Sequence, residues 1–122
     1  MVRKLNKNLL KVVIIGAGGF GQEVLDVFDA CNHKSIKYDV LGFIVETEYY
    51  DPKSIVNDKP VLGDLNWLNN NKNEVFVVCA IASPQHRRRI IQQVKKKGCR
   101  FCNIIHPSAI LTRRVKMGEG VI

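Results

Sequence analysis

Continuous apolar runs along the chain predict strands that are buried on both faces. Residues 11–15 (KVVII) and 74–81 (EVFVVCAI) are rich in β-branched side chains and lack the alternation of a half-exposed strand. Further strands are predicted at residues 38–46, 61–62 and 100–105. Runs of this kind are typical of a parallel sheet that is covered by helices on both sides.

The segments between these strands have the spacing of helices. Helices are predicted at residues 22–30, 65–70 and 85–97. Pro84 suits the first turn of the last of these helices, and Gly98 suits the position just after its end. Residues 47–60 are polar and contain two prolines, which predicts a loop. The alternation of strands and helices therefore predicts an α/β fold with a small parallel sheet and helices on both faces.

A glycine motif lies directly after the first predicted strand and before the first predicted helix. It is the G-x-G-x-x-G pattern of Gly16-Ala17-Gly18-Gly19-Phe20-Gly21. In this context Gly16 permits a tight turn, Gly18 lets the backbone approach a phosphate, and Gly21 lets the helix pack closely on the strand. The N-terminus of the helix offers unpaired N–H groups to an anion. The motif therefore predicts a nucleotide or sugar-nucleotide site on a Rossmann-like sheet.

Three further residues near strand ends have two interpretations each. Glu46, at the end of the second strand, either binds a ribose hydroxyl of the nucleotide or is a solvent-exposed strand end. Ser83 either contacts the ligand or caps the helix that follows it, and capping is favoured. Arg87, one turn into that helix, faces either a phosphate or water.

The end of the chain has a different pattern, in which small apolar residues recur every six positions. Ala109, Val115 and Val121 are spaced by six, as are Leu111 and Met117. This spacing is typical of a hexapeptide β-helix, which usually needs about three stacked repeats for stability. We therefore expect two parts: a Rossmann-like domain at residues 1–106, and at residues 107–122 a truncated first coil of a hexapeptide β-helix.

Composition narrows the classes of partner. The chain has 122 residues, of which 46% are hydrophobic and 25% charged, as expected for one soluble globular domain. Its net charge of +8 comes from basic clusters without interleaved aromatic residues, so a solvated helix face is favoured over nucleic-acid binding. No apolar run approaches the roughly 20 residues of a membrane span. The scattered cysteines favour a reducing, cytoplasmic location.

A single C-x-x-C pair is a weak candidate for a metal or redox site. Cys99 and Cys102 are followed by His106 four residues later, but no second pair completes a zinc site. A redox pair would open a helix, whereas this one starts a predicted strand. His106 precedes a proline with no visible nucleophile or carboxylate partner, so a structural role is favoured. We predict no metal site and no catalytic residue in this chain.

Taken in order, these pieces resemble the N-terminal part of sugar O- and N-acetyltransferases of the NeuD/PglD type. The motifs that carry the resemblance are KVVIIGAGGFGQEV at 11–24, VLGFIVE at 40–46, PVLGD at 60–64, FVVCAI at 76–81 and IIHPSAI at 104–110. The resemblance implies a Rossmann-like domain that binds a UDP-linked sugar, followed by a left-handed β-helix. That β-helix forms the trimer, binds acetyl-CoA and supplies the catalytic histidine, which by position lies beyond Ile122.

The resemblance also implies substrate-binding residues by position. They are Gly16, Gly18, Gly19, Phe20, Val45, Glu46 and Ala82. Family members often have Asp-Asp where this chain has Val45-Glu46, histidine where it has Phe20, and glycine where it has Ala82. Two other functions stay open from the sequence: a NAD-binding module of an oxidoreductase, and a vestigial domain that serves only as an interaction module.

Overall fold

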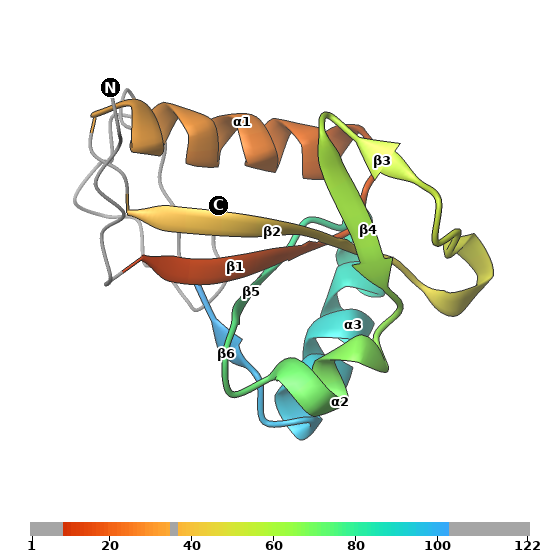
Figure 1. Ribbon diagram of the computed structural model, residues 1–122. Coiled ribbons are helices and arrows are strands. Elements are labelled where there is room, and N and C mark those ends of the chain that lie inside the picture. The colour runs from red at the N-terminus through yellow and green to blue at the C-terminus, as the bar shows by residue number, and fades with distance from the viewer. Residues whose placement is uncertain (1–8, 35–36, 103–122) are drawn as a thin grey trace.

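The computed structural model of the chain describes residues 9–34 and 37–102 (Figure 1). The strands are β1 (Leu10–Ile15), β2 (Tyr38–Ile44), β3 (Ile55–Val56), β4 (Lys59–Gly63), β5 (Phe76–Cys79) and β6 (Arg100–Phe101). The helices are α1 (Gly19–Lys34), α2 (Trp67–Asn71) and α3 (Pro84–Lys96), with a 3-10 turn η1 (Thr47–Tyr49).

The strands form one sheet in the order β3-β4-β2-β1-β5-β6. Every pair is parallel except β3 with β4, which is antiparallel. The chain runs from β1 through α1 to β2 on one side of β1, and later crosses through α2 to β5 on the other side. The order of the strands therefore reverses next to β1, as in Rossmann-like sheets, and ligands of such sheets bind at that reversal.

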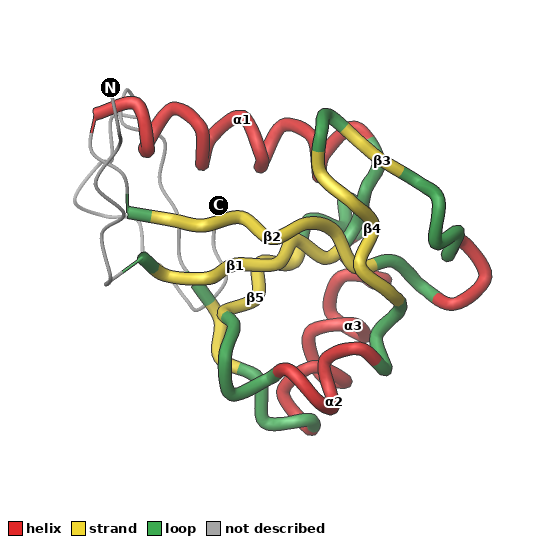
Figure 2. Tube along the Cα trace, viewed as in Figure 1, coloured by secondary structure: helices red, strands yellow, loops and turns green. Residues whose placement is uncertain are grey.

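Helices cover both faces of the sheet, as the sequence predicted. Figures 1 and 2 show α1 on one face and α2 with α3 on the other. Val12 and Ile14 of β1 pack in the core on the α1 side, while Val13 and Ile15 pack in the core on the opposite side. Alternate residues of β1 point to opposite faces, so a strand between two helical layers needs an uninterrupted apolar run.

The junction from α1 to β2 depends on one side chain. Asn32 donates from Nδ2 to the Tyr38 carbonyl at 2.8 Å and accepts the backbone N–H groups of Lys37 and Tyr38 at 3.1 and 3.0 Å. Helix α1 runs past the predicted end at residue 30, to Lys34, and begins at Gly19 rather than at residue 22. The predicted end was wrong because Asn32 ties the last turn of the helix to the strand instead of ending the helix. The predicted start was wrong because the last glycines of the motif already belong to the first turn of α1.

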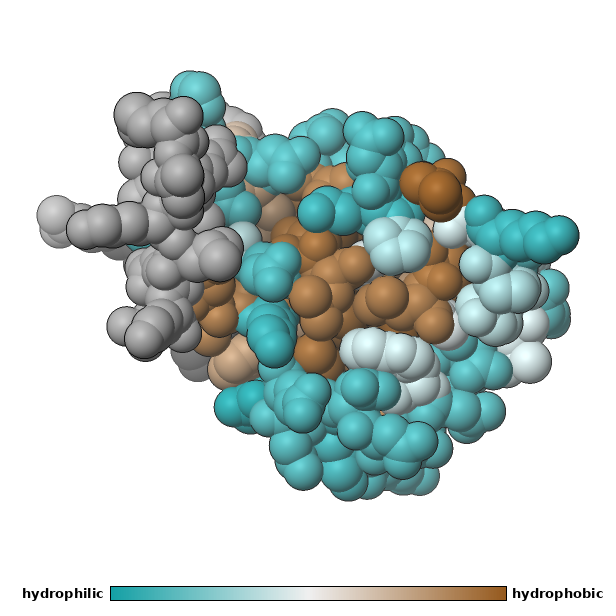
Figure 3. All heavy atoms as spheres, viewed as in Figure 1, coloured by the Kyte–Doolittle hydropathy of each residue, from teal (hydrophilic) through white to brown (hydrophobic). Residues whose placement is uncertain are grey.

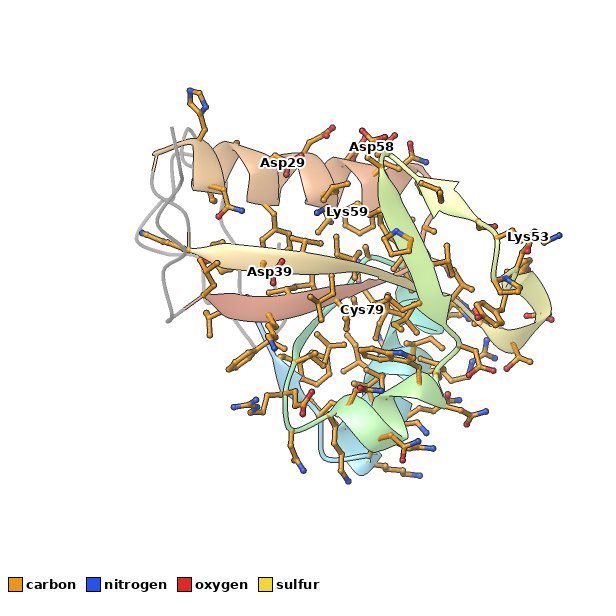
Figure 4. The ribbon with its side chains drawn as sticks, in the orientation of Figure 1. Asp29, Asp39, Lys53, Asp58, Lys59 and Cys79 are labelled. Carbon is orange, nitrogen blue, oxygen red and sulfur yellow. The ribbon has the colours of Figure 1, made fainter. Side chains whose placement is uncertain are left out.

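Part of the predicted loop at residues 47–60 forms a hairpin with the strand predicted at 61–62, and sequence analysis did not predict this hairpin. Strand β3 pairs with β4 across a two-residue turn at Asn57 and Asp58, whose φ angles are 48° and 67°. Asparagine and aspartate tolerate this left-handed backbone better than other non-glycine residues, and such turns close tight hairpins. Figure 4 shows Asp58 of this turn and Lys59, the first residue of β4, beside the first half of α1.

Strand β4 lies unusually close to β2 at Gly42. A Cβ atom at Gly42 would lie 2.3 Å from the Pro60 carbonyl oxygen, and the φ angle there is +155°. The pairing of β1 with β2 shifts register at the same place, between Val12 and Val13. Gly42 therefore allows the edge hairpin to approach the central strands.

The predicted β-helix coil at residues 107–122 and His106 lie outside the described residues. The same holds for the end of the predicted strand at 100–105, of which Arg100–Phe101 is described. Within the described ranges, no helix combines the length and apolar character needed to cross a bilayer.

Candidate functional site

A pocket of about 710 Å³ lies where β1 and β2 end. Its inner wall consists of the first turn of the glycine motif, at Gly16 and Gly18, of Val45 and Glu46 after β2, and of Ile81 after β5. These segments meet because parallel strands end at one edge of the sheet, beside the reversal in strand order. The volume falls within the range of about 300–1,000 Å³ that is usual for small-molecule sites.

The outer wall of the pocket is formed by residues 47–56, which contain η1 and β3 and which we call the hairpin segment. Glu48 and Tyr49 of η1, together with Ser54 and Val56, line this side. The Tyr49 side chain is 72% exposed although it borders the pocket, so an apolar ring surface is available there. Figure 3 shows apolar residues gathered at the middle of one face of the molecule, between hydrophilic residues at its margins.

The three glycines that define the G-x-G-x-x-G pattern, Gly16, Gly18 and Gly21, differ in why a side chain is absent at each position. Gly16 has a φ of +106°, and a Cβ atom there would lie 2.6 Å from the Ala80 carbonyl oxygen. At Gly21 a Cβ atom would lie 1.9 Å from the Gly16 carbonyl oxygen. By contrast, no heavy atom lies within 4 Å of a Cβ atom at Gly18, which is exposed at the pocket. The fold therefore requires Gly16 and Gly21, whereas Gly18 leaves room for a ligand.

A chain of polar contacts along the wall of the pocket connects α3 to the end of β2. His86 on α3 contacts the Glu46 carboxylate through Nε2, and the Arg89 guanidinium contacts Nδ1 of the same ring. A guanidinium only donates hydrogen bonds, so Nδ1 is the acceptor and the ring proton is assigned to Nε2, which donates to Glu46. His86 and Glu46 are about equally accessible, at 26% and 24%. We call these three residues the Glu46–His86–Arg89 relay.

The predicted site residues divide into two groups. Gly16, Gly18, Val45 and Glu46 line the pocket together. Gly19 is exposed, Phe20 packs against the core on the α1 side, and Ala82 is exposed; none of these three is among the residues that line the pocket. For Glu46 the structure favours a pocket residue over a plain strand end, since its carboxylate is engaged by His86.

The residues around α3 differ from their expected roles. Ser83 occupies the N-cap position, but its side chain makes no capping hydrogen bond, and the Arg87 N–H reaches the Ser83 carbonyl at 2.8 Å. Arg89 lines the pocket in place of Arg87, and His86 was not considered in the sequence. The sequence feature that could have identified His86 and Arg89 is their spacing, because residues three apart in the first turns of a helix share a face. That helix starts at the edge of the sheet where ligands bind.

A second hollow of about 550 Å³ adjoins the first. It shares Glu46, Glu48 and Arg89 with the pocket and extends toward Leu65 and Gln93. Its walls are mainly polar or charged side chains of η1 and α3. The Glu46–His86–Arg89 relay therefore stands between two spaces, not at the closed end of one.

Three of the described cysteines have thiols whose environment disfavours the reactive form. Burial raises the pKa of the thiols of Cys79, Cys99 and Cys102, in the last case to about 11. For Cys79 and Cys99, nearby donors or cations offset this increase only in part. Raised pKa values disfavour the thiolate, which is the metal-binding and nucleophilic form. No group of three or more candidate metal ligands exists among the described residues.

Comparisons with known proteins assign this architecture to a family. A model of the family described as the PglD N-terminal domain matches residues 11–94. A variant of perosamine N-acetyltransferase from Caulobacter crescentus, in complex with CoA and GDP-perosamine, has a TM-score of 0.74 at 29% identity over 90% of this chain. The acetyltransferase domain of PglB from Neisseria gonorrhoeae FA1090, in complex with acetyl coenzyme A, also has a TM-score of 0.74, at 25% identity over 92% of the chain.

The chain corresponds to part of these proteins. It covers 49% of the Caulobacter enzyme chain and 51% of the PglB chain, so it spans about half of their length. No curated protein matches it. The family and the Rossmann-like fold expected from the sequence are confirmed. The solved relatives are a perosamine N-acetyltransferase with CoA and GDP-perosamine and an acetyltransferase domain with acetyl coenzyme A.

Proposed function

We propose that this chain, which belongs to the PglD N-terminal domain family, holds the nucleotide-sugar substrate of a sugar acetyltransferase. The observation that carries the proposal is the pocket at the glycine motif, where Gly18 is exposed and no protein atom occupies the space beside it. A site of this form lets the backbone approach a phosphate without a side chain between them.

In this proposal each wall of the pocket has a role. The backbone N–H groups at the start of α1 bind the diphosphate, because that helix end carries unpaired donors and a partial positive charge. Glu46 accepts hydrogen bonds from the ribose, as acidic residues after the second strand do in Rossmann-like domains. The exposed ring of Tyr49 offers a face for the base.

The acetyl transfer itself is proposed to occur outside this domain. A sugar amine or hydroxyl attacks the thioester carbonyl of acetyl-CoA while a base removes the proton of the nucleophile. The new C–N or C–O bond forms, the C–S bond breaks, and CoA leaves as a thiolate that takes up the proton. The domain contributes the position of the sugar, which reduces the entropic cost of bringing the two reactants together. The trimeric β-helix expected from the sequence, with its catalytic histidine, and a cytoplasmic location remain parts of this proposal.

The base of the nucleotide is the part of the ligand that the pocket specifies least. The resemblance in the sequence implies UDP, whereas the Caulobacter structures contain GDP-perosamine. Both nucleotides share the ribose and diphosphate that the pocket walls described above would contact. We therefore propose a UDP-linked sugar and include GDP in the test as the competing base.

The test is a thermal-shift and calorimetric titration of the chain with UDP, UDP-N-acetylglucosamine, GDP, NAD and acetyl-CoA. A ligand that binds only the folded state stabilises it by about 2.7 kcal/mol at a hundredfold excess over Kd. We expect a response to a nucleoside diphosphate or its sugar, and loss of that response in Gly18→Val with the melting temperature retained. A response to the nucleotide in Gly18→Val equal to that of the wild type would show that the motif is not the site.

Two other functions predict different results in the same titration. A NAD-binding module also needs an acidic residue in the pocket to bind a ribose hydroxyl, and Glu46 has that position. This function predicts saturable NAD binding that Glu46→Ala weakens. A vestigial interaction domain predicts no response to any of the ligands. Binding of a nucleoside diphosphate at micromolar Kd, about −8 kcal/mol, excludes the vestigial function.

A further inference from the structure

His86 connects helix α3 to the end of strand β2 at the pocket. It lies on α3, forty positions from Glu46 in the chain, yet its ring contacts both the Glu46 carboxylate and the Arg89 guanidinium. We propose that His86 is a positioning residue that holds Glu46 in the orientation needed to recognise the ribose hydroxyls of the nucleotide. This inference rests on the proposed function, because it deepens the role given there to Glu46.

The geometry leaves half of the carboxylate available. His86 donates to Oε1 of Glu46, and no hydrogen bond from the described residues engages Oε2. A carboxylate with one oxygen held by a hydrogen bond presents its second oxygen in a defined direction, and Glu46 is among the residues that line the pocket. A hydroxyl group that donates to it then finds an acceptor already in place, which lowers the entropic cost of binding.

The orientation of the ring is itself determined by Arg89. Because the guanidinium can only donate, it holds Nδ1 as an acceptor and keeps the proton on Nε2, toward Glu46. Without that contact the ring could bind a proton on the other nitrogen and lose its hydrogen bond to the carboxylate. The three residues thus act in sequence, with Arg89 orienting His86 and His86 orienting Glu46.

The relay also reduces the electrostatic repulsion between the Glu46 carboxylate and an anionic ligand. Glu46 and Glu48 both border a pocket proposed to hold a diphosphate, and like charges at short range repel each other. The His86 N–H group and the Arg89 positive charge lie on the α3 side of Glu46 and offset its charge there. A carboxylate can therefore face the ribose next to an anionic ligand.

The proposal makes a prediction about selectivity rather than about affinity alone. His86→Ala should reduce the preference for UDP over 2′-deoxy-UDP, or for GDP over 2′-deoxy-GDP. Binding of the deoxy forms should change much less, because they lack a hydroxyl group for Glu46. One hydrogen bond to a charged group corresponds to a preference of about tenfold or more, which should fall toward one. A variant that merely loosens the fold weakens the binding of both forms equally, so the ratio separates the two effects.

Three further variants complete the experiment. Glu46→Gln should lose the same selectivity as His86→Ala. His86→Gln should restore it, because the glutamine amide supplies a donor for Glu46 and an acceptor for Arg89, as the neutral imidazole does. Gln85→Ala, on the exposed residue before His86, is the control and should leave the ratio unchanged. Dissociation constants are measured by calorimetry on the whole chain, with circular dichroism to verify folding.

The outcomes separate this inference from the proposed function. If the wild-type chain binds neither nucleotide, the proposed function fails and this inference fails with it. If the wild type binds the ribonucleotide selectively and Glu46→Gln loses the selectivity while His86→Ala keeps it, the role of His86 alone is refuted. If the wild type binds but shows no preference for the ribonucleotide, the relay does not recognise the ribose, although the pocket is still a nucleotide site.

Discussion

An added methyl group at Gly21 should damage the fold far more than one at Gly18, although both positions belong to the same motif. A Cβ atom at Gly21 would lie 1.9 Å from the Gly16 carbonyl oxygen and 2.8 Å from its carbon. That oxygen belongs to the backbone, and the Gly16 N–H is itself bonded to the Ile44 carbonyl at 2.8 Å, so the turn has little freedom to move away. At Gly18 nothing lies within 4 Å of the corresponding atom.

The magnitudes follow from these distances. Ordinary contact begins at 3.4 Å, so Gly21→Ala forces the start of α1 away from β1 or strains the turn. Overpacking on this scale costs about 3 kcal/mol, against a gain of about 1 kcal/mol from the better helix propensity of alanine. We expect a net loss of about 2 kcal/mol. Gly18 precedes the helix and does not have a positive φ, so Gly18→Ala should gain about 0.4–1 kcal/mol by restricting the unfolded chain.

Urea unfolding of the wild type and both variants, followed by circular dichroism, measures the free energy of unfolding directly. We expect the two variants to differ by more than 2 kcal/mol, with Gly21→Ala the less stable. Equal stabilities would refute the assignment of Gly21 to helix packing. A stable Gly18→Ala is also the condition under which loss of ligand in Gly18→Val reports on binding rather than folding.

Three further perturbations test other parts of the structure. Asn32→Ala removes three hydrogen bonds at the junction of α1 and β2, and we expect a loss of about 1–3 kcal/mol in urea unfolding. Gly42→Ala places a methyl group against the Pro60 carbonyl oxygen and should lower the melting temperature, while an unchanged melting temperature would show that β4 can move outward. Burial raises the pKa of Cys102 from 9.0 to about 11, so the unfolded chain releases this proton first. The free energy of unfolding should therefore fall as the pH rises from 9 to 11, with a shallower slope in Cys102→Ala.

The features that were predicted correctly depend on local sequence. The apolar runs of β1 and β5 identify strands between two layers, because burial on both faces leaves no polar position at residues 12–15 of β1 or in β5. The glycine motif was interpretable because its context, a strand before it and a helix after it, is contiguous in the chain. These observations predicted the Rossmann-like fold, whereas the resemblance to the family also needed the motifs at 40–46, 60–64 and 104–110.

The features that were missed depend on contacts between distant segments. Glu46 and His86 meet only because α3 starts beside the end of β2, and no local pattern contains that contact. Phe20, in the first turn of α1, packs against the core, a contact that the sequence did not predict, and its role in substrate binding stays a prediction. The β3–β4 hairpin was hidden because its turn uses Asn57-Asp58 in place of a glycine, and its strands are short.

The position of the hairpin segment also affects how this domain can change during evolution. The residues of η1 are not buried, and Ile55 of β3 is 71% exposed, so substitutions there remove little core packing. The same segment forms the outer wall of the pocket, while the glycine motif and the central strands form the inner wall. Under the proposed function, mutation and selection can therefore alter which base or sugar is accepted at the outer wall while the turn of the glycine motif is inherited unchanged.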